Sequence, residues 1–166
     1  MKLTSVFLVL MLAVAGSAFG QTAPPPDTAT TAAASGTFPA GVTFNGVPIN
    51  GLQIMAGAIV PGDGSPADGR LTVVLLGPNL GLGQQEITVQ VTVTGGSRPA
   101  SNVSTITGTA TVDMGTGAAP LVGVPVVATI TTDANNQGTV GLVIGGTTLP
   151  TAPIADGTMT VENLEL

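Results

Sequence analysis

The chain has 166 residues and a formal net charge of −6 at neutral pH, with charged side chains making up only 7% of it. Three Lys and Arg against nine Asp and Glu leave no basic patch, so we expect neither nucleic acid nor an anionic membrane surface as a partner. Because His and Cys are both absent, the composition excludes disulfides, Ser-His-Asp and Cys-His catalytic arrangements, and the usual zinc ligands.

Residues 1–20 have the pattern of a secretory signal peptide. Lys2 provides the positive start, residues 6–15 are apolar, and residues 18–20 (Ala-Phe-Gly) form a small-x-small cleavage site. The apolar run is too short to cross a bilayer and no later stretch is long enough, so we expect no membrane span. We therefore predict an exported protein that is secreted, extracellular or on the cell surface, or else retained in a periplasm.

Residues 21–37 are rich in Pro, Ala and Thr and show no apolar periodicity. This composition predicts a disordered or semi-extended spacer. It would be either a stalk that holds the following domain off a surface or an ordinary unstructured terminus, and we favour the second interpretation.

Residues 38–166 are predicted to form one β domain. Residues 87–94, Ile-Thr-Val-Gln-Val-Thr-Val-Thr, alternate strictly between β-branched apolar and polar side chains. Successive strand side chains point in opposite directions, so this pattern places one set on a buried sheet face and the other toward water. Comparable patterns predict further strands at 52–60, 71–76, 105–114, 124–130, 139–144, 147–149 and 158–166.

Local details constrain how these strands pair. The small residues Gly108 and Ala110 predict that a bulky neighbour or another backbone approaches the strand at 105–114 closely. Pro125 removes one hydrogen-bond donor from its strand, which indicates an edge or a bulge. The segments 67–73 and 155–161 both begin with Ala-Asp-Gly, and we interpret them as two loops entering strands rather than as a duplicated half-domain.

No segment shows helical periodicity over a useful length. About eight or nine short strands separated by Gly, Pro and Asn turns predict an all-β fold, an antiparallel β-sandwich of immunoglobulin-like type. The likeness is one of architecture, since the cysteine pair and the core tryptophan of true immunoglobulin domains are absent. A β-solenoid is the competing fold, but the chain has no constant repeat period.

Aspartates in two turn-rich loops are the candidate metal-ligating residues. Asp133 and Asn135 match the start of an Asp-x-Asn-x-x-Gly calcium loop, and Asp63 and Asp68 lie in a second, Gly-rich loop. The first match fails at Ile144, where a bidentate Glu is expected. Hairpin and surface turns explain the same residues, and we favour that interpretation over calcium binding. No other cofactor is expected.

The predicted function is a non-enzymatic exported module with a structural or protein-interaction role at the cell surface or in the extracellular matrix. Paired carboxylates remain available for catalysis, but the mature chain has no Trp or Tyr to stack on a sugar, which disfavours a glycosidase and a glycan ligand. The first alternative is a calcium-dependent domain that binds glycan or protein. The second is a self-assembling surface or fibre subunit whose strands complete a neighbour's sheet.

Overall fold

The computed structural model describes residues 25–78 and 83–164. Within these ranges the regular secondary structure is β-strand, and no helix is long and apolar enough to cross a membrane. The strands are β1 (Asp27–Thr37), β2 (Thr43–Phe44), β3 (Val47–Pro48), β4 (Gly51–Val60), β5 (Asp68–Leu76), β6 (Glu86–Ala100), β7 (Val103–Asp113), β8 (Leu121–Thr132), β9 (Gly138–Ile144), β10 (Thr147–Thr148) and β11 (Ala152–Leu164).

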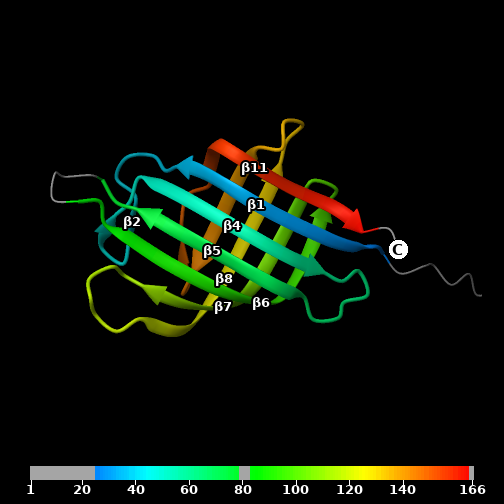
Figure 1. Cartoon of the computed structure of the whole chain (residues 1–166), viewed down its shortest axis with the longest axis horizontal. Coiled ribbons are helices and arrows are strands. Elements are labelled where there is room, and N and C mark those ends of the chain that lie inside the picture. Colours follow the sequence, from blue (N-terminus) through cyan, green and yellow to red (C-terminus); the bar gives the residue numbers. More distant parts are fainter. Residues whose placement is uncertain (1–24, 79–82, 165–166) are drawn as a thin grey trace, which may run out of the picture.

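Eight antiparallel strands form one sheet that closes into a barrel. Hydrogen-bonded neighbours follow the order β1-β4-β5-β6-β7-β8-β9-β11, and β11 pairs back to β1. Each barrel strand therefore lies beside the next barrel strand in the sequence, which is an up-and-down arrangement. In Figure 1, β1, β4 and β5 run across the front, and the strands drawn in yellow and orange cross behind them at a steep angle.

The predicted all-β class is confirmed, whereas the immunoglobulin-like sandwich is not. A sandwich consists of two separate sheets, but here β6 pairs with β7 and β9 pairs with β11, so hydrogen bonding joins the front and rear of the sheet. Sandwiches and small barrels share the same alternation of inward apolar and outward polar residues. A barrel also needs strands that bend from the front to the rear, as β6 does at the bulge between Val93 and Gly95. The alternation of apolar and polar residues does not predict such bends.

Residues 27–37 form β1, so the prediction of a disordered spacer is wrong for them. This strand pairs with β11 on one side and with β4 on the other. Its inward positions include Thr28, Thr30 and Ala32, which are all buried. Apolar periodicity missed the strand because hydroxyl and methyl side chains occupy positions that Val or Ile fill elsewhere. The signal peptide predicted for residues 1–20 and the spacer segment 21–24 lie outside the described residues.

Inward-facing side chains fill the barrel. The apolar face predicted for residues 87–94 is confirmed, because all four of its Ile and Val side chains are buried. Burying each such side chain contributes about 1.5–3 kcal/mol before the cost of ordering the chain. The largest fully buried apolar side chains are Phe44, Leu52, Ile54, Leu71, Leu75, Ile87, Ile106, Ile130, Ile144 and Met159.

One buried hydrogen bond crosses the barrel interior. The Thr30 hydroxyl of β1 donates to the Ser104 Oγ of β7 over 2.7 Å, and both side chains are 0% exposed. β1 and β7 stand opposite each other in the closed strand order, with three strands between them on either side. Since Thr and Ser have short side chains, the two opposite walls lie close together at this level.

The structure confirms both expectations about small and special residues. A Cβ placed at Gly108 would lie 2.2 Å from the Thr92 carbonyl oxygen and 2.9 Å from Val91 Cγ1, so a backbone does approach closely. Pro125 lies just beyond the last β8–β9 pair and two residues after a bulge at Gly123, whose φ is +74°. The missing N–H of Pro125 therefore falls where pairing with β9 has ended.

Gly108→Val should lower the free energy of unfolding by about 1–3 kcal/mol, because the new side chain overpacks the wall against a backbone carbonyl. Urea denaturation measures the change. Gly57→Ala in β4 is the control, since no atom lies within 4 Å of a Cβ built there, and it should change stability by less than about 0.5 kcal/mol. Equal losses in the two variants would contradict the close approach at Gly108.

Ser104→Ala should cost about 1–3 kcal/mol, because it leaves the buried Thr30 hydroxyl without its acceptor. Adding Thr30→Val should recover part of that loss, since the double variant has no unsatisfied donor. A double-mutant cycle by chemical denaturation gives the coupling. Strictly additive losses would show that the hydroxyl pair does not form in solution.

Candidate functional site

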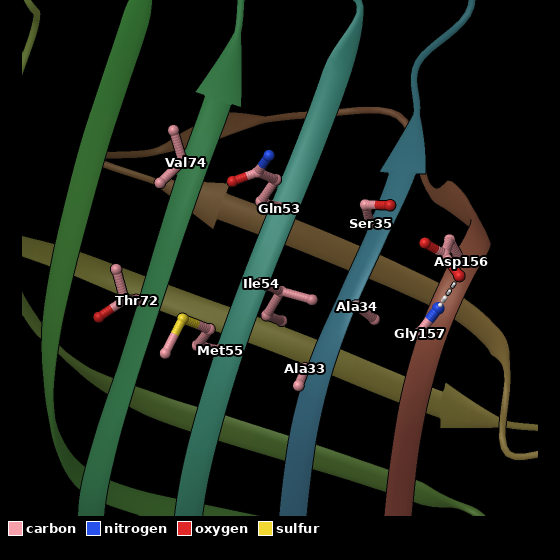
Figure 2. A pocket seen from close by; sticks show the side chains of 10 residues that line it. All are labelled: Ala33, Ala34, Ser35, Gln53, Ile54, Met55, Thr72, Val74, Asp156 and Gly157. Atoms are coloured by element: carbon pink, nitrogen blue, oxygen red, sulfur yellow. Dashed lines mark hydrogen bonds between the residues drawn. The ribbon is translucent and has the colours of Figure 1, made fainter.

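The outer face of β11, β1, β4 and β5 carries a groove of about 250 Å³. Four neighbouring strands contribute side chains to it, and small residues of β1 form its floor (Figure 2). The lining residues are Ala33, Ala34, Ser35, Gln53, Ile54, Met55, Thr72, Val74, Asp156 and Gly157.

One end of the groove is polar. Ser35 lies directly opposite Gln53 of β4 on one side and Asp156 of β11 on the other. Figure 2 shows these three side chains gathered at the same end, where the Asp156 Oδ1 accepts a hydrogen bond from the Gly157 N–H at 2.9 Å. Asp156 is the one titratable side chain among the lining residues. This end therefore offers hydrogen-bond acceptors and donors rather than an acid–base pair.

The other end of the groove is apolar and exposed. Met55 lies between Ala33 of β1 and Thr72 of β5, and 67% of its surface is accessible. Ile59, four residues further along β4 on the same outer face, is 47% exposed. Gly57 stands between them with open space where a side chain would be. The thioether of Met55 thus stands above small neighbours, free to adapt to an apolar group placed over it.

Two similar Asp-Gly segments flank this face. Segment 67–73 leads into β5 and segment 155–161 lies inside β11, so only the first enters its strand as expected. Gly69 has a φ of +144° and Gly157 a φ of +91°, and a Cβ at either would lie within 2.3 Å of a carbonyl oxygen of the adjacent strand. The strand order here is β11-β1-β4-β5, so β11 and β5 lie on the two outer sides of the central β1–β4 pair. The two Asp-Gly segments therefore occupy equivalent positions on either side of that pair.

The predicted calcium ligands Asp63 and Asp68 lie at the β4–β5 connection. The Asp63 carboxylate accepts the Ser65 N–H at 2.8 Å. The pKa of Asp63 is lowered mainly by a hydrogen bond from the Ser65 hydroxyl and secondly by the one from this N–H. Asp68 accepts the N–H of Gly69 at 2.8 Å. Asp63 thus stabilises its own turn, whereas Asp68 accepts the next backbone N–H at the start of β5.

Asp133 and Asn135 lie in the β8–β9 loop. One oxygen of Asp133 accepts the N–H groups of both Asn135 and Gln137, at 2.8 and 3.0 Å. Asn136 has a left-handed φ of +58°, and its carbonyl accepts the Met159 N–H of β11 at 2.7 Å. These contacts support the turn interpretation. In the described part of the chain, no group of three or more Asp or Glu side chains is placed to hold a metal ion, and calcium binding stays a prediction.

Sequence reasoning did not find the groove, although the pattern of β4 contained the signal. The inward positions of residues 52–60 alternate as predicted, which leaves Met55 and Ile59 at outward positions where polar residues are usual. Two large apolar side chains are therefore exposed on the wet face of one strand. The cross-strand partners that complete the groove, Ser35 and Asp156, come from β1 and β11 and depend on the register of pairing.

Asp133→Ala should lower stability by about 0.5–2 kcal/mol, because two loop N–H groups lose their acceptor. Asp113→Ala is the matched control with a single acceptor contact, to the Gly115 N–H, and should cost less. Thermal melts in a calcium chelator and in excess calcium should agree for the wild type if the loop is a turn alone. A melting temperature that rises with calcium, and no longer does so in Asp133→Ala, would instead identify a calcium site.

Comparison with known proteins gives no relative. No protein-family model matches the chain, and neither a curated protein nor a solved structure is significantly similar to it. The function is therefore inferred from the surfaces of the barrel itself.

Proposed function

We propose that this protein is an exported, non-enzymatic interaction module that binds a protein partner through the outer face of β11, β1, β4 and β5. The observation that carries the proposal is the exposure of Met55 above a groove floored by small residues. Large apolar side chains with polar neighbours are typical of protein contact sites. Export rests on the predicted signal peptide.

The energetics of the face suit a modest, specific contact. Covering the exposed parts of Met55 and Ile59 would contribute on the order of 2–4 kcal/mol of apolar burial. The remaining affinity and the orientation would come from the polar end at Ser35, Gln53 and Asp156. Because Asp156 is the charged lining residue, the face favours a partner whose apolar side chain is flanked by a hydrogen-bond donor, such as Arg, Lys or a free backbone N–H.

Self-assembly is the second candidate function, and a specific feature of β8 favours it. Leu121 and Val122 are 48% and 80% exposed. They pair with β7 on one side, while pairing with β9 begins only at Val126. A free, apolar strand edge is a template for a strand of a second copy. The Gly123 bulge and Pro125 limit that template to a short segment, so we rank it after the groove.

A photo-crosslinking amino acid placed at position 55 should capture one protein partner on the surface of producing cells. Adding Ile59→Glu to this variant should abolish capture, because a carboxylate on the apolar face must be desolvated. The same crosslinker at Thr107, an outward position on β7, is the control and should capture nothing specific. Crosslinks identified by mass spectrometry decide between the candidates. Capture of a second copy from position 122, with none from position 55, would overturn the groove in favour of self-assembly.

A further inference from the structure

A second cleft, of about 420 Å³, lies at the end of the barrel where β1 starts and where β4, β6 and β11 end. It is separate from the groove on the outer face and shares no lining residue with it. Pro25, Pro61 and Val60 supply apolar walls, and Thr28 and Arg98 supply polar ones. Arg98 is the charged residue among those that line the cleft.

Arg98 is held at the cleft by an irregularity of β6. The β6–β7 register shifts between Ser97 and Ala100, so Arg98 belongs to a bulge that turns its side chain out of the regular alternation. Its Nη2 donates to the Ser101 carbonyl oxygen. Its Nε is buried and has no hydrogen-bond partner among the described residues. An unsatisfied guanidinium N–H is costly, so this group has donor capacity that nothing in the described chain uses.

Close contacts set the positions of the cleft walls. A Cβ at Gly62 would lie 1.8 Å from the Pro25 carbonyl oxygen, and a Cβ at Gly96 would lie 2.7 Å from Val60 Cγ2. The Gly62 N–H also donates to the Asp27 carboxylate at 3.0 Å, which fixes the β4–β5 connection against the start of β1. Because these contacts already fix the apolar walls, a ligand that enters the cleft need not order them, and the entropy cost of binding is small.

We propose that this cleft binds a small organic carboxylate with an apolar body. The carboxylate pairs with the Arg98 guanidinium, which matches the planar geometry of that anion, and the hydrocarbon lies against Pro25, Pro61 and Val60. Arg98 already lines the cleft, and its buried Nε without a partner leaves the guanidinium short of one hydrogen bond. The negative net charge of the chain disfavours anions at long range, so selectivity comes from this one cation and the apolar walls.

Butyrate titrated into the full chain, followed by amide NMR shifts, tests the proposal. Butyrate should shift the signals of Gly62, Gly64 and Gly96, and the uncharged isostere butyramide should not. Arg98→Gln should weaken butyrate binding by about tenfold or more, because it removes the charge-assisted hydrogen bonds. Arg70→Gln is the matched control, since Arg70 is exposed on β5 and lies outside the cleft, and it should leave binding unchanged.

Arg98→Lys guards against a folding defect, since it keeps the charge and should retain part of the binding that Arg98→Gln loses. The spectrum away from the cleft shows whether each variant is folded. The proposal is overturned if butyrate shifts no cleft signal, or if Arg70→Gln weakens binding as much as Arg98→Gln. Inorganic phosphate binding as tightly as butyrate would also overturn it, because the apolar walls would then play no part.

Discussion

The whole barrel depends on the pairing of its first strand with its last. β1 lies between β11 and β4, and without that pairing the sheet would have two long open edges. The pairing joins residues far apart in the chain, so its formation costs loop-closure entropy that the local hairpins do not incur to the same extent. It also creates the outer groove, because Ser35 and Asp156 meet only when β11 lies against β1.

The close approach of opposite walls is the second constraint on the fold. Short side chains at Thr30 and Ser104 let β1 and β7 meet through a hydrogen bond inside the barrel. Gly108 likewise allows β7 to lie close to β6, because the Thr92 carbonyl oxygen occupies the space that a side chain at position 108 would need. Small and hydroxyl-bearing residues therefore have a packing role here that larger apolar residues could not fill.

The strand pattern was predictable from sequence where Ile and Val alternate with Thr, as in residues 87–94. The same rule missed β1, because Thr28 and Thr30 are buried and look polar in the sequence. The closing of the sheet into a barrel could not be predicted from local patterns. A sandwich and a barrel need the same inward residues and differ only in which strand edges pair. For the candidate site, the outward Met55 was visible in the sequence, but its neighbours across the strands were not. Asp63 and Asp133, two of the predicted calcium ligands, accept backbone N–H groups of their own loops, and calcium binding stays a prediction.

Asp27 lies opposite Leu164, so the chain enters and leaves the ring of strands at one point (Figure 1). The cleft that contains Arg98 lies at the same place, since Pro25 and Asn163 are among its lining residues. The groove around Met55 lies on the side wall. The groove and the cleft share no lining residue, so each surface can be altered without changing the side chains of the other.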